Sequence, residues 1–193
     1  MTDLAKQQGL GEFEKMCLGM VYNAADEDLL KRRSRALSLL EKLNAYIPSD
    51  SLKASETARE LFGFIGENTT IMARFACDYG ENISIGSNCY INYNCVVLDC
   101  AKVTIGDNVL IGPNCGIYTA IHPLESESRL QGLETAQPIT IKDGVWLGGN
   151  VVILPGVTVG ARSVIGAGSV VTKDIPDHVL AYGNPCRVVK ALP

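Results

Sequence analysis

The sequence predicts a mainly β protein: a parallel β-helix of hexapeptide repeats, with a small N-terminal helical cap and one long extruded loop. Three observations support this fold class. An aliphatic residue recurs every six positions between Ile85 and Val171, and a glycine often follows it. Glycine contributes 19 of the 193 residues and aromatic residues only 6% of them, so the core must be narrow. A period of six fits neither one face of a helix nor a long alternating strand.

Residues 1–62 are expected to form the helical cap. Asp26-Glu27-Asp28 places acids where a helix begins, and leucines then recur at helical spacing as far as Leu43. Pro48 ends this helix, and the cap-rich stretch 49–51 starts a second, short one that continues to Phe62. The basic residues 31–35 are interpreted mainly as a solvated helix face.

Residues 63–176 are expected to form the β-helix, followed by a C-terminal tail over 177–193. The aliphatic residues that set the frame are Ile85, Ile91, Val97, Ile105, Ile111, Ile117, Ile141, Leu147, Ile153, Val159, Ile165 and Val171. They point inward, while glycine with Asn or Asp supplies the turns at the corners. The small hexad residues Cys89, Cys95 and Cys115 are predicted to lie in the core rather than to carry chemistry.

The repeat is interrupted over residues 118–138. Ile117 and Ile141 are 24 positions apart, which is four hexads, so the frame survives and the segment reads as an extruded loop. The loop carries His122, one of only two histidines in the chain. A neutral His can take a proton from a hydroxyl group that attacks an acyl donor, so His122 is the candidate general base. His178, in the tail, is expected to be exposed and inert.

Composition excludes several function classes. Lys and Arg number 17 against 21 Asp and Glu, a net charge of −4, which argues against a nucleic-acid partner. The seven Cys include no CxxC pair, and two His cannot supply a three-histidine site, so no metal cofactor is expected. No GxSxG nucleophile elbow occurs, and buried cysteines would be poor nucleophiles.

The location of the protein is predicted from two further absences in the sequence. No apolar run of about 18 residues is present, so neither a transmembrane helix nor a membrane partner is expected. The segment Met1 to Phe13 lacks the apolar region of a signal peptide. A cytoplasmic protein with reduced thiols is the resulting prediction.

Several motifs occur together and in a fixed order. They are Cys77-Asp78-Tyr79-Gly80, Leu98-Asp99, Tyr118-Thr119-Ala120 with His122-Pro123, Val145-Trp146-Leu147-Gly148-Gly149 and Gly183-Asn184-Pro185-Cys186-Arg187-Val188. In these motifs the chain resembles the maltose and galactoside O-acetyltransferases of the hexapeptide-repeat acyltransferase superfamily. The resemblance implies an acetyl-CoA-dependent acetyltransferase that acts on a sugar hydroxyl. It also implies a left-handed coil and a homotrimer with active sites between neighbouring subunits.

The resemblance implies roles for individual residues at the acceptor. His122 is the general base, and Asn92 stabilises or orients the tetrahedral centre, as an amide donor can. The positions that match acceptor contacts are Arg33, Asp78, Tyr90 and Glu134. Carboxylates and a guanidinium group suit sugar hydroxyls. A solvated helix face for Arg33, and packing between coils for Tyr90, are the structural alternatives.

The resemblance also implies an acetyl-CoA site. Its positions are Gly112, Trp146, Gly149, Ala167, Thr172, Lys173, Arg187 and Lys190. The two glycines and the alanine leave room for the pantetheine arm, and the later residues match the nucleotide end, where cations meet phosphates. Trp146 matches a residue at the mouth of the groove, with a plain packing role as the alternative.

Two residues depart from the galactoside enzymes: Cys100 stands where they have a second acid, and Ala24 stands where they have an Asp. Both departures argue against a galactoside acceptor. The loop ending at Glu134 and the motif Cys77-Asp78-Tyr79-Gly80 resemble the maltose-like branch, which implies a maltose- or glucose-like acceptor. An amino group or a xenobiotic hydroxyl is the next alternative acceptor. A metal hydratase like the gamma-type carbonic anhydrases would need three His ligands. A non-catalytic β-helix scaffold would not need the loop that carries His122.

Overall fold

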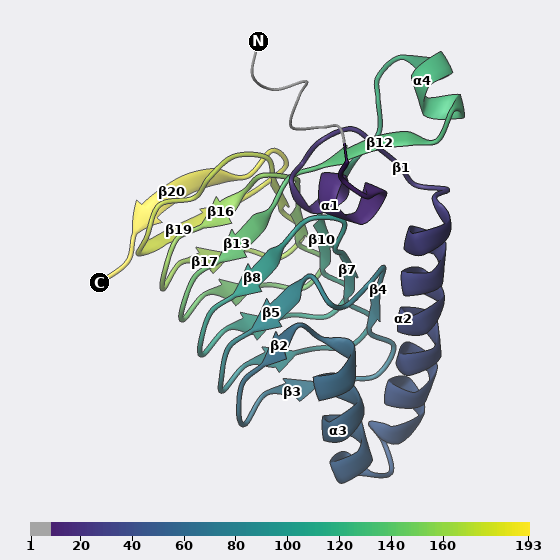
Figure 1. Ribbon diagram of the computed structural model, residues 1–193. Coiled ribbons are helices and arrows are strands. Elements are labelled where there is room, and N and C mark those ends of the chain that lie inside the picture. Colours follow the sequence, from purple (N-terminus) through teal and green to yellow (C-terminus); the bar gives the residue numbers. More distant parts are fainter. Residues whose placement is uncertain (1–8) are drawn as a thin grey trace.

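The computed structural model describes residues 9–193 and shows a parallel β-solenoid with helices packed along one end, which confirms the predicted fold class (Figure 1). Three flat sheets form its faces. The first face contains β2 (Phe64–Ile65), β5 (Ile83–Ile85), β8 (Val103–Ile105), β13 (Ile139–Ile141) and β16 (Thr158–Val159). The third face contains β4 (Ala76–Cys77), β7 (Val96–Leu98), β10 (Gly116–Tyr118), β15 (Val152–Ile153) and β18 (Val170–Val171).

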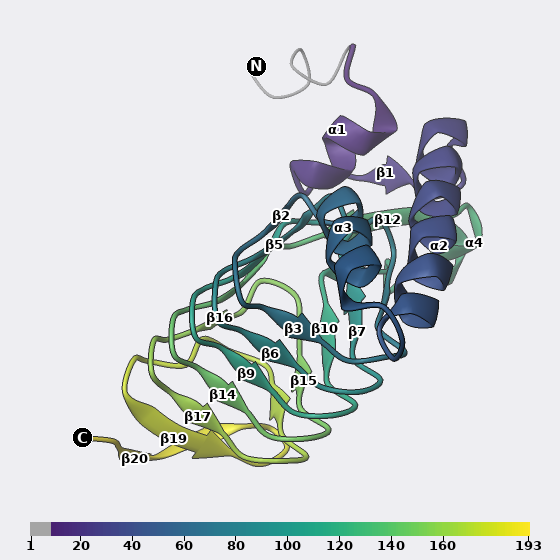
Figure 2. The same cartoon turned by 90° about the horizontal axis from the view of Figure 1, so that it is seen from below.

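The second face is the longest and carries the C-terminal tail. It contains β3 (Thr70–Ile71), β6 (Tyr90–Ile91), β9 (Leu110–Ile111), β14 (Trp146–Leu147), β17 (Val164–Ile165), β19 (Val179–Tyr182) and β20 (Arg187–Ala191). The sequence did not predict that β19 and β20 pair antiparallel, so that the tail ends the solenoid as a hairpin. Figure 2 shows this hairpin and the helices at opposite ends of the stack.

The hexad frame governs both the register and the core. Ile105 pairs with Ile141 and Ile117 with Ile153, so the loop leaves the frame undisturbed, as predicted. The frame residues are buried, and Cys89, Cys95 and Cys115 are at most 2% exposed, which confirms their predicted place in the core. At the corners, Asn takes the left-handed conformation, for example Asn88 with φ 58° and Asn108 with φ 57°. Asn tolerates this region better than most residues do.

The helices are α1 (Glu12–Cys17), α2 (Glu27–Tyr46), α3 (Ser51–Leu61) and, within the loop, α4 (Ser126–Leu130). Asp26 caps α2 by accepting a hydrogen bond from the amide of Asp28, and Asp50 caps α3 through the amide of Lys53. Leucines of α2 bury one face against the solenoid. None of the helices in the described part of the chain is long and apolar enough to cross a membrane.

The extruded loop is more ordered than the sequence suggested. It leaves β10, forms β11 (Ala120–Ile121), passes through α4 and returns as β12 (Leu133–Ala136). Strand β12 pairs antiparallel with β11 and also with β1 (Tyr22–Asn23) from the N-terminal region. This three-stranded sheet joins the loop to the cap, two segments more than 100 positions apart in the chain (Figure 1).

Candidate functional site

Within one chain, predicted site residues such as Asp78, Asn92 and Gly112 lie on two different corners of the solenoid. The first, here the acidic corner, comprises the residues that follow strands of the third face: Asp78 after β4, Asp99 after β7 and Thr119 after β10. The second, here the glycine corner, comprises the residues that follow strands of the second face: Asn92 after β6, Gly112 after β9, Gly148 and Gly149 after β14, and Gly166 and Ala167 after β17.

Asp99 organises the backbone of the acidic corner. Its Oδ1 accepts hydrogen bonds from the amides of Asp78, at 3.0 Å, and Tyr79, at 2.9 Å. Its side chain is fully buried and Oδ2 has no hydrogen-bond partner. Burial raises the pKa of Asp99 to about 6, with a further contribution from the carboxylate of Asp78, while the two amides act in the opposite direction. Asp99 therefore fixes the turn from which the side chain of Asp78 projects.

Asp78 is flanked by a cation and a thiol. Its Oδ1 lies 3.8 Å from Nε of Arg33, and its Oδ2 accepts a long hydrogen bond of 3.6 Å from the thiol of Cys100. Arg33 also donates from Nη2 to the hydroxyl of Tyr79 at 3.0 Å. Burial raises the pKa of Asp78 above its ordinary value, and the guanidinium of Arg33 opposes that rise. Arg33 thus belongs to this cluster and does not lie on a solvated helix face.

The histidine of the loop faces a carboxylate. Nδ1 of His122 lies 3.6 Å from Oε1 of Glu134, and the imidazole is 61% exposed whereas the Glu134 side chain is only 14% exposed. The hydroxyl of Tyr22 donates to Oε2 of Glu134 at 2.6 Å, and Tyr22 itself is buried. The antiparallel register of β1 and β12 sets this contact, because it places Tyr22 opposite Glu134.

Three residues of this cluster received no role from the sequence alone: Tyr22, Tyr79 and Asp99. Tyr79 and Asp99 lie in motifs quoted above, and Tyr79 directly follows Asp78, so their membership of those motifs was the available signal. Cys100 is buried, which makes its thiol a poor nucleophile. Burial raises its pKa to about 12, and the nearby carboxylates add to that rise. Among residues 9–193, no group of three His, Cys, Asp or Glu side chains could hold a metal ion.

The glycine corner is built by close approach of successive coils. A Cβ on Gly112 would lie 2.6 Å from the amide nitrogen of Gly149, and one on Gly148 would lie 2.6 Å from that of Ala167. Gly149 differs, because the nearest atoms to its Cβ would be those of Pro113 at 3.4 Å. Intrachain packing therefore explains the glycine at 112 but not the one at 149.

Tyr90, Asn92 and Trp146 lie on or beside the second face. Tyr90 is in register with Leu110 and Leu110 with Trp146, and the three outward side chains are 36%, 49% and 53% exposed. Oδ1 of Asn92 accepts a hydrogen bond of 2.8 Å from the amide of Tyr93. This apolar ladder beside the glycine corner is separated by the third face from the cluster around His122.

The four residues predicted at the nucleotide end are exposed and lie toward the C-terminal end of the solenoid. Thr172 and Lys173 follow β18, and Arg187 and Lys190 lie on β20. Strand β18 is four strands away from β4 in the third face, which corresponds to about 19 Å at the usual strand spacing. The cations thus lie far along the solenoid axis from Asp78 and Arg33.

Three segments of the chain match sequence signatures of known families. Residues 15–66 match the maltose acetyltransferase hexapeptide capping motif, residues 138–173 match the bacterial transferase hexapeptide, and residues 102–122 match the hexapeptide repeat of succinyl-transferase. Together these signatures span the helical cap and much of the repeat region.

Relatives that align over nearly their whole length share the sequence, and the solved structures among them share the fold. A Saccharomyces cerevisiae protein assigned as an acetyltransferase is 53% identical over 184 residues, which cover 95% of this chain and 94% of the relative. The crystal structure of a maltose O-acetyltransferase from Clostridium difficile 630 has a TM-score of 0.93 and 46% identity, covering 95% of this chain and 98% of the other. A hexapeptide-repeat acetyltransferase of Vibrio cholerae, solved with acetyl coenzyme A, has a TM-score of 0.89 and 42% identity, covering 95% and 100%.

Proposed function

The chain belongs to the hexapeptide-repeat acetyltransferases that carry the maltose acetyltransferase capping motif, and we propose from this premise that it transfers an acetyl group from acetyl-CoA to a sugar hydroxyl. The acceptor is maltose, glucose or a closely similar sugar. The observation that carries the proposal is the contact of His122 with Glu134, which is itself held by the hydroxyl of Tyr22.

His122 acts as general base in a direct attack. The acceptor hydroxyl loses its proton to the imidazole as its oxygen attacks the thioester carbonyl, and Glu134 stabilises the imidazolium that forms. The tetrahedral intermediate then collapses: the C–S bond breaks, and the imidazolium returns the proton to the departing CoA thiolate. No covalent enzyme intermediate is needed, in keeping with the raised pKa of Cys100.

The acidic corner binds the acceptor. The carboxylate of Asp78 accepts hydrogen bonds from sugar hydroxyls, and Arg33 donates to sugar oxygens while holding Asp78 in place. Because Glu134 lies against Nδ1 of His122, its main role is to orient and charge-stabilise the base, with acceptor contact as a second role. Tyr90 contacts the acceptor from the other corner.

The complete site forms between two copies of the chain in a homotrimer. His122 and Asn92 lie on different corners, so a neighbouring subunit brings its Asn92 across to the histidine and orients the tetrahedral centre. Acetyl-CoA lies along the glycine corner. Its pantetheine arm passes Gly112, Gly149 and Ala167, with Trp146 at the mouth of the groove. The nucleotide end binds Arg187 and Lys190 of β20, together with Thr172 and Lys173, which follow a strand of the third face.

The test is an acceptor panel with acetyl-CoA as donor, followed by release of the free CoA thiol. Maltose and glucose should give the highest kcat/KM, ahead of galactosides, amino acceptors and xenobiotic alcohols. Replacement His122→Ala should lower kcat by about 10²–10⁴, the range expected for loss of a general base. His178→Asn serves as the matched control and should retain wild-type kcat. His178 is half-buried, not exposed as predicted, and its φ of 57° suits Asn better than Ala. If His122→Ala released CoA as fast as the wild type, the assignment of the base would be wrong.

A further inference from the structure

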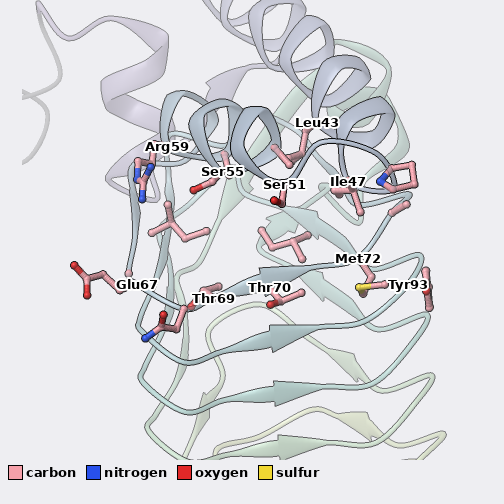
Figure 3. Close-up of a pocket in the computed structure, with 18 residues that line it drawn as sticks. Leu43, Ile47, Ser51, Ser55, Arg59, Glu67, Thr69, Thr70, Met72 and Tyr93 are labelled. Atoms are coloured by element: carbon pink, nitrogen blue, oxygen red, sulfur yellow. The ribbon is translucent and has the colours of Figure 1, made fainter.

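A cavity of about 340 Å³ lies between α3 and the first coil of the solenoid, and Figure 3 shows the residues that line it. Arg59 and Glu67 lie toward one end, and Met72 and Tyr93 lie toward the other. None of the lining residues belongs to the acidic corner. Cys100, by contrast, lies inside that corner beside residues of the proposed mechanism, although the mechanism gives it no role.

The thiol of Cys100 contacts two side chains of the site. It donates a long hydrogen bond of 3.6 Å to Oδ2 of Asp78. It also lies next to the hydroxyl of Tyr22: burial is the main reason that the pKa values of both groups are raised, and the two groups act on each other as well. Tyr22 and Cys100 are each 1% exposed and belong to one small apolar cluster. Solvent water therefore does not compete for these contacts.

Tyr22 extends this contact as far as the proposed base. Its hydroxyl donates to Oε2 of Glu134 at 2.6 Å, and Oε1 of Glu134 lies 3.6 Å from Nδ1 of His122. A continuous chain of side-chain contacts thus joins the acceptor carboxylate, Asp78, to the catalytic imidazole. Cys100 and Tyr22 are its two middle members.

The two middle members each supply one proton to the chain. The hydroxyl of Tyr22 donates to Glu134, and the thiol of Cys100 donates to Asp78, so each carboxylate has its own donor. A carboxylate at position 100 would have no proton to give and would compete with Glu134 for the single hydroxyl proton of Tyr22. A thiol is only a weak acceptor, so it leaves that proton on Glu134.

We propose that Tyr22 and Cys100 are positioning residues that act on the base through Glu134: the neutral thiol leaves the Tyr22 hydroxyl free to bind Glu134, which fixes that carboxylate against His122. The inference rests on the proposed function, because it takes His122 as the general base. Both residues act through a neighbour and take no part in the bond changes. The thiol that stands where the galactoside enzymes have a second acid thus serves the base.

Other charges surround this chain of contacts. The groups that face Tyr22, Cys100 and Asp78 from neighbouring elements are Glu134 of β12, Asp99 after β7 and Arg33 of α2. The group that faces His122 is Glu134. A neutral substitution at position 22 leaves all of these charges in place, so its effect on the histidine can be assigned to the lost donor.

The first experiment follows the two histidines of the chain by proton NMR in the ligand-free protein as the pH is varied. In Tyr22→Phe, Glu134 loses the donor on Oε2 and attracts the imidazolium more strongly. His122 should therefore titrate about half to one pH unit higher than in the wild type. The titration of His178 is the internal reference and should not move.

Tyr79→Phe is the matched control for Tyr22→Phe. Tyr79 is equally buried, but its hydroxyl accepts a hydrogen bond from Arg33 and does not contact Glu134. The same hydroxyl group is lost from the same cluster. Tyr79→Phe should leave the titration of His122 as it is in the wild type.

The second experiment separates charge from shape at position 100. Asp and Asn have the same shape, but only Cys100→Asp adds a third carboxylate beside Tyr22. The acid limb of the pH profile of kcat/KM should lie about one pH unit higher in Cys100→Asp than in Cys100→Asn. The neutral, conservative Cys100→Ser should restore the wild-type profile. If Cys100→Asp fails to fold, the comparison of Tyr22→Phe with Tyr79→Phe still decides the inference.

Two results would overturn the inference. In the first, His122 titrates at the same pH in Tyr22→Phe and Tyr79→Phe, which would assign Tyr22 to packing alone. In the second, the acid limb is the same in Cys100→Asp and Cys100→Asn. If no sugar released CoA while His122 still shifted in Tyr22→Phe, the proposed function would be wrong and the link between Tyr22 and His122 would stand.

Discussion

The acidic corner and the glycine corner lie on the same solenoid but are built by different means. At the glycine corner, each coil repeats the last, and the spacing of one backbone above another dictates glycine at position 112. At the acidic corner, the side chains differ from coil to coil: Asp99 accepts from the backbone of the turn, the thiol of Cys100 donates to Asp78, and Asp78 lies beside Arg33 of the cap. The repeat thus supplies a rigid frame, and departures from the repeat supply the chemistry.

The two corners also differ in solvation. The acidic corner buries a carboxylate with an unpartnered oxygen and a thiol, and burial raises the pKa of both groups. The glycine corner presents main chain and an apolar ladder at the surface. Changes at the acidic corner should therefore alter the chemical step or its pH dependence, and changes at the glycine corner should alter binding of the donor.

The largest effect among these further changes is expected for Glu134→Gln. The amide keeps the shape of the side chain and can still accept the hydrogen bond from Tyr22, but it removes the charge beside Nδ1 of His122. We expect kcat to fall on the order of 10² because the imidazolium loses its counter-charge. The measurement is steady-state release of CoA with maltose or glucose as acceptor.

Glu127→Gln is the matched control, because Glu127 is an exposed residue of α4 in the same loop. It should retain wild-type kcat. If Glu134→Gln instead raised KM for the sugar and left kcat unchanged, Glu134 would act only on the acceptor.

The next effect concerns Asp99 and pH. Its pKa in the native state is about 6, above the ordinary value of 3.8, so the native state holds the proton to higher pH than the unfolded state does. As pH rises from about 4 to 6, the carboxyl of Asp99 ionises first in the unfolded state. The free energy of unfolding of the wild type should therefore fall by about 1–3 kcal/mol because of this group. Asp99→Asn should lack that loss, so denaturant unfolding at pH 4, 5, 6 and 7 should show the variant gaining relative to the wild type.

Asp107→Asn provides the control, because Oδ1 of Asp107 also accepts a backbone hydrogen bond, from Ser87 at 2.7 Å, but the residue is exposed. Its stability should run parallel to that of the wild type over this range. Parallel curves for Asp99→Asn as well would mean that Asp99 is ionised at pH 4 and that burial does not raise its pKa.

The sequence predicted those parts of the molecule that the six-residue period controls. The strands, the inward cysteines and the in-phase return at Ile141 follow from local spacing, because every coil sees the same neighbours above and below. The pairing of β1 with β12, and with it the contact of Tyr22 with Glu134, depends on segments more than 100 positions apart and leaves no periodic signal. For the same reason the motifs indicated Asp78 and His122 but not the buried support that Asp99 gives to one of them.

The smallest effects are expected at the glycine corner, where Gly112→Ala and Gly149→Ala should differ in their effect on stability. A methyl group at 112 meets the backbone of the next coil at 2.6 Å, so Gly112→Ala should destabilise the fold by about 1–3 kcal/mol. At 149 the nearest atoms are 3.4 Å away and no positive φ is required, so Gly149→Ala should fold with a melting temperature close to that of the wild type.

No atom of the chain lies closer than 3.4 Å to a Cβ at position 149, so the space beside Gly149 is open. If the pantetheine arm passes through this space, the methyl group of Gly149→Ala would clash with it. We expect KM for acetyl-CoA to rise about tenfold, which corresponds to about 1.4 kcal/mol, with KM for the sugar unchanged. Initial rates at varied acetyl-CoA and fixed acceptor measure this difference. An unchanged KM for acetyl-CoA would place the donor elsewhere and leave the glycine at 149 without a ligand-based explanation. A lowered melting temperature would assign it to packing, as at 112.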